Sequence, residues 1–311
     1  MSNTTNNFEN NLASVIDAAK KKNCVCVEQE PLRKYTTFKI GGNARVMIFI
    51  DNVDALSEIY SMCVNLRIPC FVIGNGSNLL VSDDGYNGVV MKLDNKFKDI
   101  SPIDESGTLI RCGAGVTLAK LCKYALDNSL SGLEFAWGIP GTVGGAAFMN
   151  AGAYDGEMKN VIESVSCILP DGTIQTVDAD NLNMSYRHSV FSDNAGIITS
   201  VTMRLKSDNQ KLIRDRMDDF MNRRRSKQPL EYPSAGSVFK RPEGYYAGKL
   251  IEDCGLKGTM IGGAQVSEKH AGFIINKSDA SCSDVRELIK HIQDTVERET
   301  GVKLECEIRM V

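Results

Sequence analysis

The chain has 311 residues, of which 42% are apolar and 24% are charged, an ordinary composition for a globular protein. A formal net charge of −3 argues against nucleic-acid binding as the main function, because nucleic-acid-binding domains are usually basic. No apolar run in the sequence approaches the ~18–20 residues that cross a bilayer, and the polar start lacks the pattern of an export signal. We therefore expect a cytoplasmic protein with neither a nucleic acid nor a membrane as partner.

The ten cysteines raise the question of a metal or disulfide framework. Cys24 and Cys26 are close together, but no second pair lies nearby, and the other cysteines are scattered through mostly apolar runs. This spacing fits neither a zinc site nor a disulfide framework. Free cysteine behaves as a small buried apolar residue, so we expect reduced structural thiols and no metal.

The first part of the chain alternates helix and strand patterns. Apolar residues at helical spacing predict a helix over 9–22. A strand over 44–50, a helix over 51–67 and a short buried strand over 69–74 follow. This order is typical of a small α/β unit.

From about residue 88 to 205 short strand patterns alternate with turns. One helix is predicted over 118–126, and Asp171-Gly172 in LPDGTI predicts a β-hairpin. A cationic amphipathic helix over 211–227 then leads to a third region.

The third region ends in a helix and an alternating run. Ser281 or Ser283 can cap the helix at its start, and Gly301 ends it. The run 302–310 alternates apolar and polar residues, which predicts a strand. The side chains expected to share its apolar face are Val302, Leu304, Cys306, Ile308 and Met310.

Two glycine-rich segments could carry chemistry. In VIGNGSNLLVSD (72–83) small residues would let backbone N–H groups converge on a phosphate, with Ser77 and Asn78 as added donors. The alternative is a type I′ hairpin at Asn75-Gly76. Segment 138–157 holds six glycines and four alanines, and it matches neither a Rossmann fingerprint nor a P-loop. It indicates either a cofactor lying against the backbone or two closely crossing backbones.

Two further segments contain candidate reactive side chains. Arg187 follows Tyr186 in SYRHSVF, where a guanidinium fork could clamp a carboxylate or phosphate or form a surface ion pair. The neighbouring His188 could be a base or part of a hydrogen-bonded structure. Ser237 in SAGSVFKRP has no histidine within twenty residues on either side. It is therefore part of a turn into a strand, or it moves a proton in chemistry other than that of a local hydrolase triad.

Taken together and in order, several segments resemble one family, the UDP-N-acetylenolpyruvoylglucosamine reductases (MurB) of bacterial cell-wall synthesis. The resemblance runs through nearly the whole chain and leaves out only the first thirty residues. The segments that carry it are YTTFKIGGNA (35–44), GNGSNLL (74–80), GAGV (113–116), GLEFAWGIPGTVGGAAFMNAGAYDGE (132–157), YRHSVF (186–191), YPSAGSVFKRP (232–242), AGKLIEDCGLKG (247–258) and LECEIR (304–309).

The resemblance implies an α+β fold with a two-subdomain FAD-binding unit and a C-terminal α+β substrate domain. The FAD-binding unit would be of the non-Rossmann kind shared with vanillyl-alcohol-oxidase-like flavoenzymes. The boundaries that we expect are a helical extension at 1–30, FAD subdomains at 31–87 and 88–210, and the substrate domain at 211–311.

The implied function is the NADPH-dependent, FAD-mediated reduction of UDP-N-acetylglucosamine enolpyruvate to UDP-N-acetylmuramate, a step in peptidoglycan precursor synthesis. We expect a monomer, because no exposed apolar stripe is evident in the sequence. We expect dissociable FAD, because no histidine or cysteine stands out as a covalent tether. The chain resembles the shorter type of the family, which lacks the tyrosine-bearing loop over the substrate.

The family's catalytic residues carry over to three positions. Ser237 matches the proton donor, Arg187 the arginine facing the substrate carboxylate, and Glu307 a glutamate that could hydrogen-bond the same enolate. From the residues alone, Glu307 would be a solvent-facing position beside Glu305 and Arg309.

The remaining candidates follow from the matched segments. The residues expected to hold FAD are Gly74, Asn75, Gly76, Ser77, Asn78, Leu79, Gly115, Ile139, Pro140, Gly141, Thr142, Gly144, Gly145, Ala146, Asn150, Gly152 and Ala153. Those expected to bind substrate are Tyr186, Lys227, Gly236, Lys240, Arg241 and Lys249. Some family members have asparagine at the position of Arg241.

Two alternatives belong to other functional classes. A flavin oxidase or dehydrogenase on the same FAD scaffold would act on an alcohol or hydroxy acid, but its third region would differ from SAGSVFK and LECEIR. A non-catalytic module that binds nucleotide sugars would need no flavin, so the colour of the purified protein distinguishes it.

Overall fold

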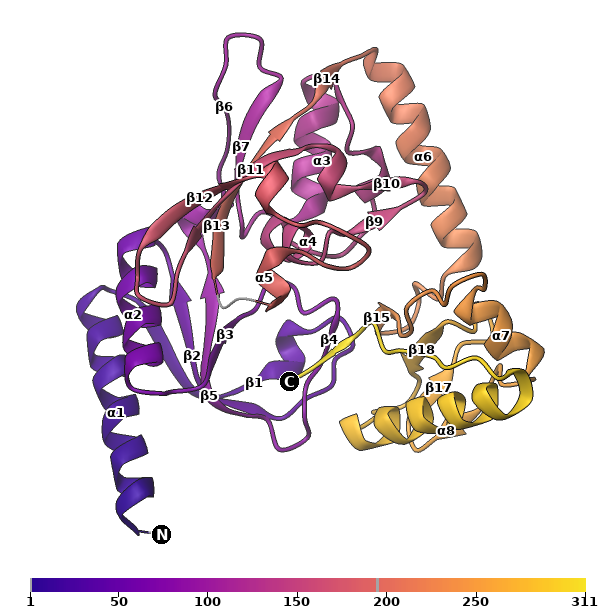
Figure 1. Ribbon diagram of the computed structural model, residues 1–311, viewed down its shortest axis with the longest axis horizontal. Coiled ribbons are helices and arrows are strands. Elements are labelled where there is room, and N and C mark those ends of the chain that lie inside the picture. Colours follow the sequence, from indigo (N-terminus) through magenta and orange to yellow (C-terminus); the bar gives the residue numbers. More distant parts are fainter. Residues whose placement is uncertain (1, 194–195) are drawn as a thin grey trace. The chain divides into compact units, whose positions relative to one another are not determined.

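The computed structural model of the chain describes residues 2–193 and 196–311, and residues 1, 194 and 195 lie outside the described residues (Figure 1). The backbone divides into two units, which are described separately. Unit 1 consists of Met1–Gln29, Arg45–Gly74 and Asn87–Met221. Unit 2 consists of Glu30–Ala44, Asn75–Tyr86 and Asn222–Val311.

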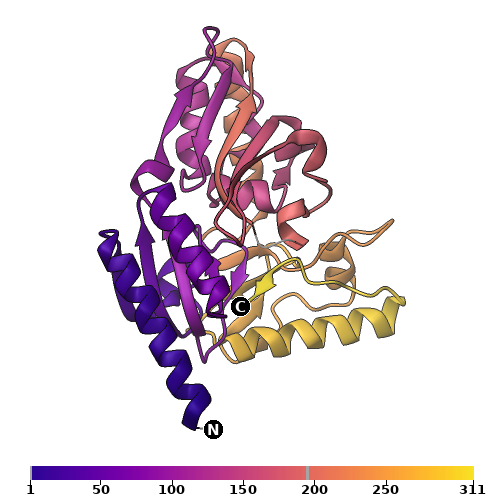
Figure 2. The ribbon, with the colours of Figure 1, turned by 60° about the vertical axis from the view of Figure 1, so that its left-hand side comes forward.

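The first sheet has four strands in the order β1 (Val25–Pro31), β2 (Asn43–Ile50), β5 (Tyr86–Leu93) and β3 (Cys70–Val72). Two helices, α1 (Ser2–Lys21) and α2 (Val53–Asn65), lie side by side against it (Figure 2). Asn52 caps α2, because its side chain accepts a hydrogen bond from the Ala55 N–H at 2.9 Å. The helices and strands predicted over 9–74 are confirmed, although α1 begins at Ser2 rather than at residue 9 and the other ends differ by at most two residues.

The second sheet has five antiparallel strands in the order β12 (Ile174–Asp178), β11 (Ile162–Ile168), β13 (Ile197–Arg204), β7 (Leu109–Gly113) and β6 (Ile100–Pro102). The predicted hairpin is confirmed as β11–β12, and its turn places Gly172 at φ +88°, a conformation that favours glycine. The helices α3 (Leu118–Asp127), α4 (Val143–Phe148) and α5 (Val190–Asp193) belong to the same region.

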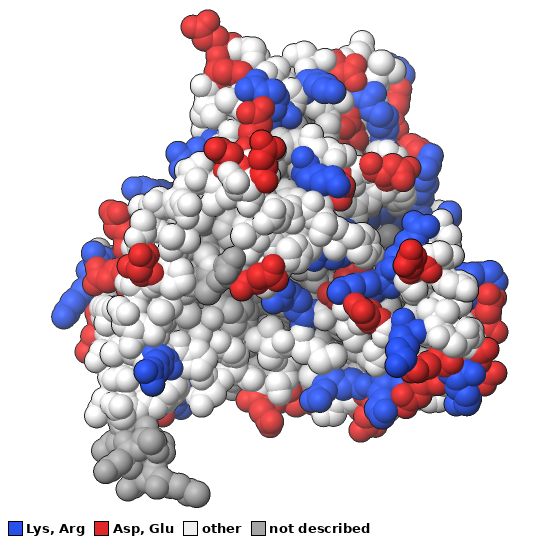
Figure 3. Space-filling model, in the orientation of Figure 1, with Lys and Arg blue, Asp and Glu red and all other residues white. Residues whose placement is uncertain are grey.

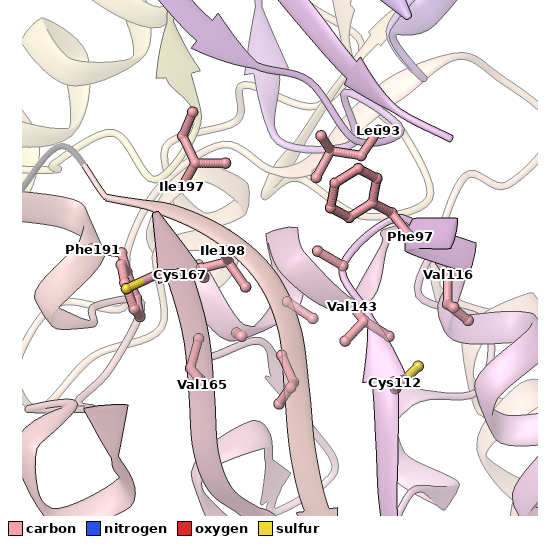
Figure 4. Close-up of a cluster of buried hydrophobic side chains, with 14 of the residues drawn as sticks. Leu93, Phe97, Cys112, Val116, Val143, Val165, Cys167, Phe191, Ile197 and Ile198 are labelled. Atoms are coloured by element: carbon pink, nitrogen blue, oxygen red, sulfur yellow. The ribbon is translucent and has the colours of Figure 1, made fainter. Parts of the chain in front are cut away.

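The core of unit 1 draws side chains from many elements, and Figure 4 shows part of it around Val143 and Ile198. Cys112 and Cys167 lie in this cluster as buried apolar groups. Burial raises the pKa of Cys112 to about 12, so this thiol stays protonated. All ten cysteines are free thiols, and the described residues contain no group of three or more potential metal ligands.

Short elements connect these layers. Those in unit 1 are η2 (Asn95–Lys98), β8 (Leu130–Ser131), η3 (Glu134–Ala136), β9 (Gly152–Ala153), β10 (Gly156–Glu157), η4 (Met158–Asn160), η5 (Ala179–Asn181) and β14 (Lys206–Ser207). The helix predicted over 211–227 is confirmed as α6 (Gln210–Lys227). Its Arg216 donates to the buried carboxylate of Glu134 at 2.8 Å and fixes the first part of α6.

Unit 2 contains a four-stranded antiparallel sheet in the order β15 (Ser234–Ser237), β18 (Phe273–Asn276), β17 (Ala264–Val266) and β16 (Met260–Ile261). Helix α8 (Cys282–Thr300), in yellow, packs against the sheet, and α7 (Ala247–Asp253) contributes to the same core (Figure 1). The short elements η1 (Leu32–Tyr35) and β4 (Leu79–Leu80) also belong to unit 2.

Helix α8 has the ends that the sequence predicts. Ser281 is its N-cap and forms a capping box with Asp284, whereas Ser283 lies in the first turn. Gly301 ends the helix at φ +73°.

The prediction of one continuous strand over 302–310 is wrong. The segment forms an isolated bridge between Cys306 and Phe239, and only β19 (Arg309–Met310) is a strand, parallel to β4. The segment does not form one strand because Cys306 pairs with Phe239, whereas Arg309 and Met310 pair with β4. Leu304 and Ile308 are buried as expected, but Met310 is 49% exposed.

Charge is distributed without large single-sign regions on the face shown in Figure 3, where acidic and basic side chains are interspersed. This distribution agrees with the formal net charge of −3. Among the described helices, none is both long enough and apolar enough to cross a membrane.

Candidate cofactor and substrate sites

In unit 1 the glycine-rich segment that starts at residue 138 folds back against the GAGV turn. The Val143 N–H donates to the Val116 carbonyl at 2.8 Å, and the Gly144 N–H donates to the Ala114 carbonyl at 2.9 Å. Thr142 caps α4, with Oγ1 accepting from the Gly145 N–H at 3.4 Å. The structure therefore brings together the candidate cofactor residues Gly115 and 141–146.

Most glycines of this region are required by contacts within the protein. A Cβ at Gly74 would lie 2.4 Å from Thr142 Oγ1, and one at Gly115 would lie 2.9 Å from the Leu93 carbonyl oxygen. A Cβ at Gly144 would lie 2.8 Å from the Cβ of Ala114. At these positions the alternative of closely crossing backbones accounts for the glycine.

Gly145 is different, because no close contact in the described residues requires it. It is exposed, and an added Cβ would meet only Thr142 Oγ1, at 3.5 Å. Glycine in a helix costs ~1 kcal/mol relative to alanine. A flat ligand lying against this turn would explain the missing side chain, so the segment fits a large planar cofactor here.

The candidate residues 150–153 are held against the loop that contains Arg187. The buried Asn150 amide donates to Glu157 Oε2 at 2.8 Å and to the Ser185 carbonyl at 3.0 Å, and its Oδ1 accepts from the Lys159 N–H. These three bonds give the Asn150 side chain a structural role. Gly152 lies in the β9–β10 hairpin, where a Cβ would lie 2.8 Å from the Cβ of Glu157.

Arg187 adopts a left-handed backbone conformation with φ +57°, which is uncommon for a residue with a side chain. Its guanidinium donates to the Gly152 carbonyl at 3.3 Å and lies 5.0 Å from the centre of the exposed Tyr186 ring. The neighbouring His188 pairs with Asp193 at 2.8 Å, which agrees with the hydrogen-bonded alternative for this histidine. The loop thus aims Arg187 toward residues 150–153.

The candidate phosphate loop is shared between the units, with Gly74 in unit 1 and Asn75–Leu79 in unit 2. Its hairpin alternative is wrong, because β3 pairs with β5 whereas β4 pairs with β19. Gly76 has φ +56°, and a Cβ there would lie 2.4 Å from the Tyr35 carbonyl oxygen. The Asn78 amide donates to the Glu307 carbonyl at 3.2 Å and so anchors the last segment of the chain.

Ser237 and Glu307 are neighbours in unit 2. The Glu307 N–H donates to the Val238 carbonyl at 2.7 Å, and the Lys240 N–H donates to the Glu305 carbonyl at 2.8 Å. Ser237 is half-buried, and its hydroxyl donates to the Phe239 carbonyl at 3.3 Å. Glu307 is also half-buried, whereas Glu305 is exposed.

The candidate substrate cations of unit 2 are mostly exposed. Lys240 pairs with Glu305 at 3.1 Å, and Lys249 pairs with Asp253 one turn along α7. The Arg241 guanidinium lies 4.1 Å from the centre of the Tyr246 ring. Lys227 is exposed at the end of α6, and a Cβ on Gly236, which has φ +79°, would meet no atom within 4 Å.

Two residues that lie close to candidate site residues were not identified from the sequence. The half-buried Lys92 donates to the Gly74 carbonyl at 2.7 Å, and burial lowers the pKa of its amine. His270 lies beside Ser237 across Gly272, although it is far away in sequence. No local motif marks either residue: Lys92 lies in β5, and His270 lies in the turn between β17 and β18.

Comparison with known proteins identifies both parts of the chain. A family model described as an FAD binding domain matches residues 44–178. A second, described as the C-terminal domain of UDP-N-acetylenolpyruvoylglucosamine reductase, matches residues 228–311. These matches confirm the predicted α+β architecture, in which an FAD-binding domain precedes a separate C-terminal domain.

Curated relatives named UDP-N-acetylenolpyruvoylglucosamine reductase cover almost the whole chain. The protein of Syntrophomonas wolfei is 47% identical over 282 residues, which are 91% of this chain and 93% of the relative. That of Clostridium botulinum is 44% identical over 306 residues, 98% of both chains. The crystal structure of the Thermus caldophilus enzyme superimposes with a TM-score of 0.79 at 35% identity, covering 92% of this chain and 98% of that one.

Proposed function

Since the chain belongs to the family of UDP-N-acetylenolpyruvoylglucosamine reductases, we propose that it reduces UDP-N-acetylglucosamine enolpyruvate to UDP-N-acetylmuramate with electrons from NADPH. The chain is an oxidoreductase with an FAD-binding domain. The reaction adds a hydride and a proton across a carbon–carbon double bond. Its product serves peptidoglycan precursor synthesis.

FAD would be held without a covalent bond by the backbone around Gly145, together with Gly115 and Gly141. When bound, FAD supplies a two-electron carrier that accepts hydride from NADPH and donates it to the alkene. The open position at Gly145 supports this assignment, because the described contacts of the protein leave it unexplained.

Ser237 would protonate the substrate carbon that receives no hydride. A serine hydroxyl is a weak acid, so it must be held in line and within about 3 Å of the basic carbon to deliver its proton. The observation that carries the proposal is the pairing of 238–240 with 305–307, because it holds the segment after Ser237 against the segment that contains Glu307. Glu307, protonated or sharing a proton, would hydrogen-bond the developing enolate.

Arg187 would stabilise the negative charge that spreads into the substrate carboxylate. A planar guanidinium can donate two hydrogen bonds to a carboxylate, and a fixed cation favours the enolate because its negative charge exceeds that of the starting enolpyruvate. Its hydrogen bond to Gly152 supports this role, because it limits the movement of the side chain.

The diphosphate of the substrate carries two negative charges and calls for several cations. We assign this role to Lys227, Lys240, Arg241 and Lys249, which share unit 2 with Ser237. Tyr186 and Gly236 complete the proposed substrate contacts.

Anaerobic absorbance measurements test the two half-reactions separately. NADPH should bleach the flavin band of the purified protein, and UDP-N-acetylglucosamine enolpyruvate should then restore it. Bleaching without recovery would assign the flavoprotein to another substrate. Absence of flavin absorbance even after addition of FAD would contradict the cofactor assignment.

The substitution Ser237→Ala tests the proton donor. We expect flavin reduction by NADPH at an almost unchanged rate, whereas reoxidation by substrate should slow by at least about 10²-fold, the lower range for removal of a positioned acid. Ser234→Ala, in the same strand, is the matched control. An unchanged reoxidation rate in Ser237→Ala would remove Ser237 from the mechanism.

A further inference from the structure

The imidazole of His270 lies in a slot made by two glycines of unit 2. An added Cβ at Gly248 would lie 3.1 Å from the ring atom Cε1, and one at Gly272 would lie 3.0 Å from the same atom. The Phe273 ring meets the imidazole edge-on, with 5.1 Å between ring centres. Ser267 Oγ accepts the His270 N–H at 3.3 Å and fixes the backbone. The ring therefore has little freedom to rotate.

The hydrogen bonding of the ring defines its protonation state. The Gly272 N–H donates to His270 Nδ1 at 3.1 Å, so Nδ1 carries a lone pair and the proton lies on Nε2. Burial is the main cause that lowers the pKa of His270 below its ordinary value of 6.5. The positive charges of Lys257 and Lys227 act in the same direction, whereas the His270 backbone and Glu252 oppose it. The folded protein thus favours neutral His270.

A chain of hydrogen bonds leads from this imidazole to Val238, the residue that follows Ser237. The Gly272 carbonyl accepts the Val238 N–H at 2.9 Å, so Gly272 is held at both ends, by His270 and by Val238. Ser237 is paired with Phe273, the residue after Gly272. A Cβ on Gly272 would lie 3.6 Å from Ser237 Oγ, so the serine hydroxyl lies next to this glycine.

We propose that neutral His270 is a positioning residue for Ser237. Its Nδ1 accepts a hydrogen bond from the Gly272 N–H and thereby fixes the backbone beside Phe273, the residue with which Ser237 is paired. Glycine has the widest backbone freedom of any residue, so Gly272 depends on such external restraints. A displacement of about 1 Å of a reacting group can cost about 10²-fold in rate. This inference rests on the proposed role of Ser237 as proton donor.

Protonation of His270 would place a proton on Nδ1, facing the Gly272 N–H, and the hydrogen bond would be lost. Because the pKa of His270 is lowered, this loss begins only below the ordinary value of 6.5. We therefore expect the reoxidation half-reaction to keep its rate at neutral pH and to fall on the acid side. Flavin reduction by NADPH should not show this fall.

Two isosteric variants of the full-length holoenzyme separate the two ring nitrogens. In His270→Asn the amide oxygen takes the position of Nδ1 and can accept the N–H two residues on, as in an Asx-turn. In His270→Gln the amide reaches the position of Nε2, and the acceptor for Gly272 is lost. We expect His270→Asn to retain the reoxidation rate and to abolish the fall of that rate at acid pH. His270→Gln should slow reoxidation by about 10²-fold.

The same experiment in a Ser237→Ala background tests whether His270 acts through Ser237. If it does, adding His270→Gln to Ser237→Ala slows reoxidation no further. In the protein that retains Ser237, His270→Gln raises the solvent deuterium isotope effect on reoxidation. Equal slowing of reoxidation by His270→Gln with and without Ser237 would overturn the proposal. So would a normal reoxidation rate in His270→Gln together with a slow one in His270→Asn. If Ser237→Ala itself reoxidises normally, the proposed function of Ser237 fails, whatever the His270 variants do.

Nitrogen-15 NMR of the unsubstituted protein gives a readout that does not depend on turnover. We expect His270 to show a protonated Nε2 and an unprotonated Nδ1 at neutral pH. The opposite tautomer, or a doubly protonated ring, would contradict the proposal even if a variant failed to fold.

Discussion

At the scale of single residues, an absent Cβ has two different meanings in this chain. Gly144 and Gly145 are adjacent in the first turn of α4, yet only Gly144 lies against another backbone segment. We expect Gly144→Ala to lower the melting temperature, because the new Cβ would lie 2.8 Å from that of Ala114. Gly145→Ala should instead stabilise the FAD-free protein by up to ~1 kcal/mol.

The two alanine variants should also differ in cofactor binding. Gly145→Ala adds a methyl group where we place FAD, so its FAD dissociation constant, measured by flavin fluorescence, should rise although the apoprotein is more stable. Gly144→Ala serves as the comparison, because it loses stability for an internal reason. If Gly145→Ala binds FAD as tightly as the unsubstituted protein, the cofactor does not lie against this turn.

Single side chains were the hardest feature to predict from sequence. Glu307 lies in a run of alternating polar residues, and its half-buried position depends on pairing with Val238. His270 has no sequence neighbour that suggests its slot, since the slot is closed by Gly248 on another element. Such positions depend on contacts between distant segments, which local periodicity does not encode.

At the scale of elements, helices were predictable because their signals are local. Ser281 and Gly301 mark the ends of α8 in the sequence itself. The run 302–310 has an equally clear alternation, yet it forms only a bridge and a short parallel strand. A strand depends on which partners are available beside it, and that information lies elsewhere in the chain.

The start of α8 receives additional stabilisation from Asp83, a residue distant in sequence. Its carboxylate accepts hydrogen bonds from the Cys282 N–H at 2.7 Å and the Ser283 N–H at 2.9 Å. Partial burial alone would raise the pKa of Asp83, but these hydrogen bonds outweigh it and lower the pKa below its ordinary value of 3.8. The charge also interacts favourably with the helix N-terminus.

Asp83→Ala should therefore lower the free energy of unfolding by about 1 kcal/mol, the usual effect of losing a helix cap. Since the folded pKa is lowered, the contribution is complete above pH 3.8 and is lost as the pH falls through the folded value. Thermal unfolding at neutral and acidic pH measures both effects. Asp84→Ala, one residue along, is the matched control, and equal effects of the two substitutions would contradict this role for Asp83.

At the scale of the whole molecule, the two units are not consecutive stretches of sequence. Unit 2 takes two segments, Glu30–Ala44 and Asn75–Tyr86, from within the part that sequence patterns assign to FAD binding. The predicted boundaries at 31–87 and 211–311 follow changes of pattern along the chain. A pattern of this kind cannot reveal that a short segment packs into a core assembled much later in the sequence.

The inserted segments supply essential parts of the unit 2 core. Phe38, Ile40 and Leu80 are at most 2% exposed and pack in one cluster with side chains of β15 and α8. β4 pairs with β19, and Thr37 Oγ1 donates to the Ser234 carbonyl at 2.7 Å. Loss of one large buried side chain costs about 2–5 kcal/mol, and whole domains are stable by only about 5–15 kcal/mol.

We therefore expect the polypeptide 222–311, expressed alone, to remain unfolded, although it contains the entire segment 228–311 that matches the family's C-terminal domain. Its amide NMR spectrum should be poorly dispersed, and its circular dichroism should change gradually on heating. The intact chain, measured under the same conditions, should show dispersed signals and a cooperative transition. A dispersed spectrum with cooperative melting of 222–311 would mean that its own apolar side chains suffice, and that Phe38, Ile40 and Leu80 only cover a core formed without them.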